Sequence, residues 1–586
     1  MKIYSSSLKN FAVECQLISK NVQNKSVSSR LKELFDLTWK EDLQDFPEFA
    51  TYLGTTDHDH RWTDLSEAKL QEYHQKNQIK LQTLKSIPYN ELDASEQLNY
   101  DLFQQQLDNE IKSHFFHSEY LILDQMSGVQ QDIARILLIM PQRTEKDWEN
   151  RLQRLISLPL LIDQTISLLQ KGLEKKITPP QITLRDVPSQ VKEHTVKDLE
   201  RNPLFASFKQ LPINFSEKFQ ERIFTQAKTL LWKKVIPAYE KLHNFLTQTY
   251  LPNCRTEIAW KSLPQGQEWY QFLVEKMTTT SLTASEIHQI GLTEVKNIQE
   301  KTDELLKSTG FPGTCQKYFQ KLHQEPQYFY TKREEIIQGY QELSRKIEPN
   351  LPLLFEKIPQ LGYNIESVPE YSEKSNPAAY YIPGAISTQR PGIFFANTYQ
   401  PEKRPKWEMK AVFLHEAIPG HHFQISLAQE IENIPEFRKH IDYTAYVEGW
   451  GLYAEKLGYE LGVYQKDVES QFGQLFTELL RAVRLVIDTG IHELGKSRNW
   501  AIQYFSDNCH MEKHEIIVEV DRYIVLPAQA LAYKIGERKI LELRKVAEKQ
   551  LGKSFNIRKF HQLVLGSGVL PLNVLEKRVQ EWIANH

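Results

Sequence analysis

The sequence lacks long apolar runs, paired cysteine motifs and an excess of charge of one sign. No stretch of about twenty consecutive apolar residues occurs, so we expect no membrane-spanning helix. The 72 basic residues are balanced by 75 acidic ones, and the net charge of -3 gives no general attraction to nucleic acid or to an anionic membrane. We therefore expect neither nucleic acid nor a membrane as a partner.

The cysteines are few and widely separated, and none forms a CxxC pair. They therefore predict buried free thiols rather than a disulfide framework or a cysteine-based zinc site: Cys15, Cys254, Cys315 and Cys509. The first twenty residues contain neither an uninterrupted apolar stretch nor a small-residue cleavage pattern. We predict no secretory signal and a cytoplasmic location, although an enzyme exported by another route would look the same.

What the chain has in abundance is helical periodicity. Apolar residues recur at three- and four-residue intervals over residues 31–106, 145–175 and 215–250. Residues 252–268 are punctuated by proline and glycine, as in a connection between lobes. We predict a mainly α fold with an N-terminal helical lobe, residues 1–260, and a catalytic helical lobe, residues 261–586.

One region has the pattern of β-strands. Residues 378–398, AAYYIPGAISTQRPGIFFANT, pair two apolar and aromatic runs across a turn that contains Gly, Ser, Arg and Pro. This pattern predicts a small β-hairpin directly before the strongest motif of the chain.

That motif is HEAIPGHH, which places His415, Glu416, His421 and His422 within eight residues. In the HExxH arrangement, two histidines four residues apart share one helical face and hold zinc, and the glutamate between them takes a proton from a water. Zinc lowers the pKa of a bound water to about 7. The motif therefore predicts a zinc site with Glu416 as the general base.

The spacing departs from that arrangement and leaves two candidates for the second ligand. Six helical residues turn by about 600°, which points His421 away from His415, whereas seven residues restore the direction at a rise of about 10 Å. Pro419 and Gly420 lie in the gap and disturb a helix. We infer a two-residue bulge that brings His421 into place, with His422 as the competing choice.

A third protein ligand is expected, because a catalytic zinc commonly takes three and leaves one position for water. In TAYVEGWGLYAEKLG, Glu448 lies among apolar helical positions, where a carboxylate is costly to bury unless a positive partner is present. Glu455, seven residues later, is either a supporting partner or a solvated charge. We predict one Zn²⁺ per chain, held by His415, His421 and Glu448.

HEAIPGHH and EGWGLYAEKLG together resemble the bacterial family catalogued as domain of unknown function 885. Residues 481–498, residues 519–544 and FPEFATYLGTTDHDHRWTDLS near the N-terminus also resemble that family, so the likeness covers nearly the whole chain. It implies a two-lobed, helical, zincin-like fold with a deep cleft, similar in plan to carboxypeptidase Taq and angiotensin-converting-enzyme peptidases. One departure is Ala528, where the family's PGQAL leads us to expect glycine at a local bend.

Peptide hydrolysis also needs a donor for the oxyanion of the tetrahedral intermediate. The candidates are His492, Tyr523 and Tyr533, and Arg522 is a candidate for substrate binding. The alternatives are a core histidine, packing tyrosines and an ordinary ion pair.

The hairpin is the expected substrate-binding edge, because a strand can pair with an extended peptide backbone. Tyr381 and Asn397 would line it, together with Tyr380. Arg390 would hold a substrate carboxylate or, as a turn residue, would simply be solvated.

These features predict a zinc metallopeptidase that acts on short peptides, the only partner we expect; the oligomeric state stays undefined. Two alternatives remain: a zinc hydrolase of esters or non-peptide amides, and a non-catalytic peptide-binding relative.

Overall fold

The computed structural model describes residues 6–20, 25–209, 211–212, 214–370, 373, 376–386, 389–509 and 511–586. It divides into two compact units. Unit 1 comprises residues 1–258, 262–265 and 435–437, and unit 2 comprises residues 259–261, 266–434 and 438–586. The division falls where the sequence places its connection, but residues 435–437 belong to unit 1 although they are distant in sequence.

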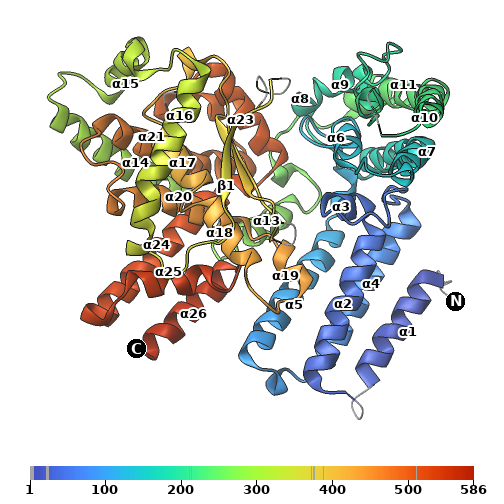
Figure 1. The fold of residues 1–586 in the computed structure, drawn as a ribbon, viewed down its shortest axis with the longest axis horizontal. Helices are drawn as coiled ribbons and strands as arrows, with labels where there is room; N and C mark the ends of the chain where they lie inside the picture. The colour runs from blue at the N-terminus through green and yellow to red at the C-terminus, as the bar shows by residue number, and fades with distance from the viewer. Residues whose placement is uncertain are drawn as a thin grey trace. The chain divides into compact units, whose positions relative to one another are not determined.

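Unit 1 is helical. In Figure 1 its first helices, drawn in blue, lie side by side. Their bounds are α1 (Ser6–Lys20), α2 (Val27–Asp45), α3 (Pro47–Tyr52), α4 (Glu67–Lys85) and α5 (Ala94–Phe115). The remaining helices are α6 (Asp132–Ile139), α7 (Glu145–Lys175), α8 (Gln181–Leu184), α9 (Val187–Glu193), α10 (Glu217–Leu230), α11 (Ile236–Phe245) and α12 (Leu251–Asn253).

Helix α7 organises the core of unit 1 and has the bounds that its periodicity predicts. Thr144 and Asp147 form a capping box at its start, which satisfies backbone N–H groups that have no partner within the helix. Its apolar stripe, which includes Trp148, Leu155 and Leu169, is buried against α10 and α11. Burial of this stripe stabilises the unit, since each large apolar side chain contributes about 1.5–3 kcal/mol.

Unit 2 carries the candidate site. Before the motif lie α13 (Gly266–Thr278), α14 (Ala284–Thr309), α15 (Cys315–Gln324) and α16 (Arg333–Ile347), then β1 (Tyr363–Ser367), β2 (Ala379–Ile382) and β3 (Gly392–Ala396). The motif region contains α17 (Met409–Glu416), α18 (His421–Gln429) and α20 (Thr444–Glu460). Between α18 and α20 in sequence lies α19 (Glu436–His440), whose first two residues belong to unit 1. The C-terminal helices are α21 (Val468–His492), α22 (Arg498–Asn508), α23 (Lys513–Val525), α24 (Ala532–Leu551), α25 (Ile557–Leu565) and α26 (Leu572–Ala584).

The sheet has the strand order β1-β3-β2. The predicted hairpin is confirmed, because β2 and β3 pair antiparallel; residues 387 and 388 in its connection lie outside the described residues. Strand β1, which pairs parallel to β3, was not predicted. In β3, Phe394 faces inward and contacts Tyr340 of α16 and Phe413 of α17. The sheet therefore packs against the helix that carries His415.

The mainly α fold class with a small sheet is confirmed. Within the described residues, no helix combines the length and the apolarity that crossing a membrane requires. The predicted cleft between the lobes stays a prediction.

Candidate metal centre

The helix that begins the motif stops within it. Helix α17 ends at Glu416, and α18 begins at His421. The two histidines therefore come from separate helices, and the predicted bulge within a single helix is wrong. A Cβ atom on Gly420 would lie 1.8 Å from the His415 carbonyl oxygen, so only glycine allows this close approach. The Pro-Gly sequence thereby ends one helix and starts the next at a new angle.

This change of direction brings together His415, His421 and Glu448, whose potential ligand atoms all lie within 4.8 Å of one another. Glu448 Oε2 is 3.4 Å from His415 Nε2 and 3.5 Å from His421 Nε2. Tetrahedral zinc with bonds of 2.0–2.2 Å places neighbouring donor atoms about 3.4 Å apart. Two imidazoles and one carboxylate also suit zinc chemically, so the residues fit the ion that the sequence predicts.

His415 is held by a second carboxylate. Its Nδ1 lies 2.9 Å from Oε1 of Glu455, a residue that is 1% exposed. This contact leaves Nε2 free to face Glu448 and is the arrangement that orients metal-binding histidines. Burial opposes protonation of His415, but the hydrogen bonds to Glu448 and Glu455 outweigh it and raise the pKa of the imidazole to about 9. Glu455 is thus a supporting partner and not a solvated charge.

Glycine on α20 makes room for this imidazole. A Cβ atom on Gly451 would lie 2.8 Å from Cε1 of His415. The sequence EGWG therefore supplies both a candidate ligand, Glu448, and the space in which a second candidate, His415, lies.

His421 has a different partner. Its Nδ1 lies 2.8 Å from the amide nitrogen of Gln424, which also donates to the Val447 carbonyl, and the buried Oε1 of Gln424 has no partner among the described residues. When Nε2 binds a cation, Nδ1 carries the proton. A 180° turn of the Gln424 amide would then give that proton an acceptor, but it would break the hydrogen bond from Gln424 to the Val447 carbonyl.

His422 points elsewhere. Its Nδ1 lies 2.9 Å from the Tyr381 hydroxyl, and its ring packs 4.5 Å from the Tyr363 ring. Burial lowers the pKa of His422 to about 4, so the ring is neutral and connects α18 to the sheet. Of the two candidates for the second ligand, the geometry selects His421.

Glu416 lies next to the ligands and is partly exposed. Its carboxylate forms no hydrogen bond or ion pair with any described residue, yet it is close enough to His415 to raise the pKa of that imidazole. A carboxylate beside the metal position, without a protein partner, is available to exchange protons with a water or a leaving group.

Two predicted catalytic residues are wrong. His492 is fully buried; Nε2 lies 2.9 Å from the Tyr523 carbonyl, and Nδ1 accepts from the Trp260 backbone N–H. Along α21, His492 lies fifteen residues, or about 22 Å, after Thr477, the residue that contacts Glu455 beside the candidate metal centre. The Tyr523 hydroxyl donates to Glu519 and accepts from Arg484. Both side chains are satisfied within the core and have no donor left for substrate.

Arg522 and Tyr533 belong to a polar cluster that the sequence did not define. The Arg522 guanidinium donates to Gln529 and reaches the Tyr533 hydroxyl at 3.4 Å. Arg484 of α21, which we did not predict, lies over the Tyr533 ring at 4.8 Å. An arginine within the apolar run AVRLVI is the signal that would have revealed it.

The sheet residues have unequal roles. Tyr381 contacts His422 beside the site, as described above. Asn397 is buried; its amide donates to the Glu373 and Asn376 carbonyls and its oxygen accepts from the Tyr399 N–H, so its predicted role in substrate binding is wrong. Arg390 is exposed in the turn, where it donates to the Pro383 carbonyl. Arg390 therefore lies where the alternative prediction places it, as a solvated residue of the turn.

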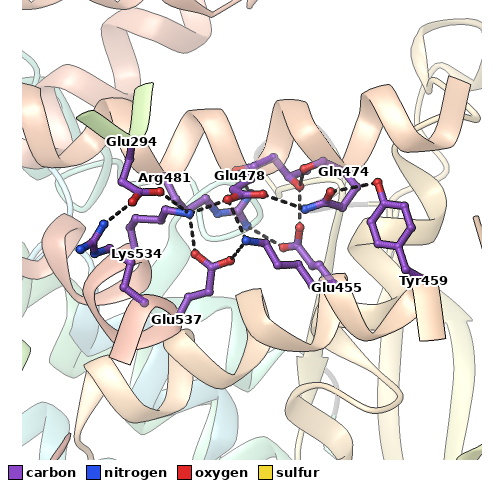
Figure 2. Close-up of polar contacts among 11 residues, drawn as sticks. Glu294, Glu455, Tyr459, Gln474, Glu478, Arg481, Lys534 and Glu537 are labelled. Carbon is purple, nitrogen blue, oxygen red and sulfur yellow. Dashed lines mark hydrogen bonds and ion pairs between the residues drawn. The ribbon is translucent and has the colours of Figure 1, made fainter. Parts of the chain in front are cut away.

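A buried polar network continues from Glu455 (Figure 2). Glu455 accepts a 2.5 Å hydrogen bond from Thr477 and lies 3.8 Å from Arg481, both on α21. One residue further along each helix, Lys456 of α20 pairs with Glu478 of α21. The remaining members, from α14, α21 and α24, are Glu294, Gln474, Lys534, Glu537 and Arg538. The network ties the helix that carries Glu448 to its neighbours.

The fold and this site define a mainly helical protein with a candidate His/His/Glu metal centre. Residues 47–579 match the family described as "Bacterial protein of unknown function (DUF885)", and the chain belongs to that family. No curated protein matches the chain.

Two solved structures are similar. One is a protein of Colwellia psychrerythraea, described provisionally as a lipoprotein, with 27% identity, a TM-score of 0.90, and coverage of 96% of this chain and all of its own. The other, from Shewanella oneidensis, is described provisionally as a lipoprotein of unknown function. It has 16% identity and a TM-score of 0.75, over 93% of this chain and 99% of its own, and shows the fold alone.

Proposed function

We propose that this protein is a zinc-dependent hydrolase of peptide bonds, with short peptides as substrates. The observation that carries the proposal is the convergence of His415, His421 and Glu448 within 4.8 Å, beside the unpaired carboxylate of Glu416. When bound, the cation supplies a Lewis acid that polarises a carbonyl group and activates a water molecule. The resemblance of HEAIPGHH to zinc peptidase motifs supports peptide bonds as the target.

Each protein group has a definable task in this proposal. Glu416 accepts a proton from water and delivers it to the leaving amine. Glu455 and Gln424 orient the two imidazoles, and Tyr381 holds His422 so that the sheet edge stays beside α18. A strand edge in this position would pair with an extended substrate.

The test is a digest of a peptide mixture by the purified protein, read by mass spectrometry with and without a chelator. We expect cleavage that the chelator abolishes and zinc restores. Ester substrates tested in parallel would distinguish a peptidase from the alternative, a hydrolase of esters. Cleavage that survives complete removal of metal would contradict the proposal.

Glu416→Gln separates catalysis from binding. We expect turnover to fall by about 10²–10⁴-fold, the usual contribution of a general base, while zinc stays near one per chain. The matched control is Glu430→Gln, a partly buried glutamate at the end of α18. Full activity in Glu416→Gln would contradict the role of Glu416 as the general base. A wild-type protein that binds peptides without cleaving them would be the alternative, a non-catalytic peptide-binding relative.

A further inference from the structure

The cluster around Arg484 in unit 2 has more positive than negative charge. Arg484 donates to Glu519 at 2.9 Å, and Arg522 lies 3.6 Å from the same carboxylate. Burial opposes ionisation of Glu519, but these guanidinium groups lower its pKa to about 2, so it is charged at neutral pH. Two cations share one anion, which leaves one net positive charge.

Two hydrogen-bond donors in this cluster have no acceptor among the described residues. Arg484 is 6% exposed; its Nε and Nη2 donate hydrogen bonds, whereas Nη1 forms none with a described residue. The Tyr533 hydroxyl accepts from Arg522 and Gln529 and donates to none of the described residues. A guanidinium N–H that no described residue accepts can donate to the carboxylate of a ligand.

The cluster lies close to the metal ligands along two helices. On α21, Thr477 and Arg481 contact Glu455, which is the partner of His415. Arg484 lies about one turn after Arg481, and about 10 Å along the helix from Thr477. On α24, Tyr533 lies one turn before Gly536, which packs against Gly449 beside Glu448.

We propose that Arg484 and Tyr533 bind the terminal carboxylate of a peptide substrate, so that the enzyme cleaves near the C-terminus of short peptides. A carboxylate supplies one negative charge and two acceptor oxygens, which match the excess charge and the two unused donors. This inference rests on the proposed function and narrows its substrates. It moves the carboxylate-binding role from Arg390 of the hairpin to Arg484.

The test compares the same di- to pentapeptides with a free C-terminal carboxylate or a C-terminal amide. We expect wild-type kcat/KM to be at least 100-fold higher for the free acids. Arg484→Met should lower kcat/KM for the acids to the level of the amides and leave the amides unchanged. Tyr533→Phe, which keeps the ring, should lower kcat/KM by about tenfold for the free acids and leave kcat/KM for the amides unchanged. Tyr446→Phe, which removes a buried hydroxyl bonded to the Val564 carbonyl, is the matched control.

The outcomes separate the two proposals. If the wild type cleaves neither form, the proposed function fails and this inference fails with it. If it cleaves both forms equally, or if both variants keep the preference for acids, the function stands and the carboxylate site is overturned. If Arg484→Met does not fold, Tyr533→Phe decides the question alone.

Discussion

Unit 2 contains two clusters of buried charges that differ in one respect. In the network of Figure 2, the ammonium groups of Lys456 and Lys534 are both paired with Glu478 and Glu537 at 2.6–2.9 Å, and cations and anions balance. In the cluster around Arg484, two cations share one anion, so one cation is in excess. The comparison suggests that a balanced cluster fixes helices in place, whereas an unbalanced one is completed by a ligand.

The largest expected effect is on the balanced network. Lys534→Met leaves Glu478 and Glu537 buried with one cation fewer, and breaking such a pair costs about 3–5 kcal/mol. We expect a large drop in the thermal midpoint of unit 2, measured by calorimetry. Lys545→Met, an exposed lysine on the same helix, is the control. Equal midpoints in the two variants would mean that the network contributes nothing to stability.

The next effect concerns pH and the unbalanced cluster. The pKa of Glu519 lies at about 2 in the folded protein, below its ordinary 4.5, so its contribution of about 3 kcal/mol is present above pH 4.5 and is lost as the pH falls toward 2. Glu519→Gln should therefore be less stable than wild type at pH 7, and the difference should vanish near pH 2. A difference in unfolding free energy that does not change with pH would contradict this assignment.

A smaller effect separates support of the metal from support of the fold. Glu455→Gln weakens the orientation of His415, and we expect zinc affinity to fall by about 10–100-fold in a chelator competition assay. Glu478→Gln removes an equally buried carboxylate of the same network without contact to a ligand. We expect it to lower stability and to leave zinc affinity unchanged. Similar zinc affinities in both variants would show that Glu455 has no special role.

The smallest effect tests backbone strain. Ala528 has φ +66°, a left-handed conformation that costs a non-glycine residue about 1–2 kcal/mol. Its N–H donates to Asp488 on α21, the helix of the Arg484 cluster. Ala528→Gly should raise stability by up to about 1 kcal/mol, since added backbone entropy offsets part of the gain. A lower melting temperature would contradict this account.

The sequence predicted the regular parts of the fold and the three residues that converge at the candidate metal centre. Helix α7 and the β2–β3 hairpin have strong periodicity, so their positions could be read directly. Strand β1 was missed because it is only five residues long and most of its side chains are exposed, so the alternation of Tyr363 and Ile365 with polar residues is too short to stand out. The convergence of His415, His421 and Glu448 was predictable because these candidate ligands lie in two short motifs.

The supporting residues were harder to predict, because their roles depend on packing between distant helices. His492 and Tyr523 carry the right chemical groups but bond within the core. Arg484 could have been identified by the reasoning used for Glu448, since each is a charge within an apolar helix. Whether such a charge is already paired depends on residues dozens of positions away, which one sequence does not show.

The most direct test of the central claim is a crystal structure of the zinc-loaded protein, with data collected on both sides of the zinc absorption edge. We predict one anomalous peak, 2.0–2.2 Å from His415 Nε2, His421 Nε2 and a Glu448 oxygen, with His422 still bonded to Tyr381. A peak bound by His422 instead of His421, or an ion bound at another place in the chain, would contradict the account.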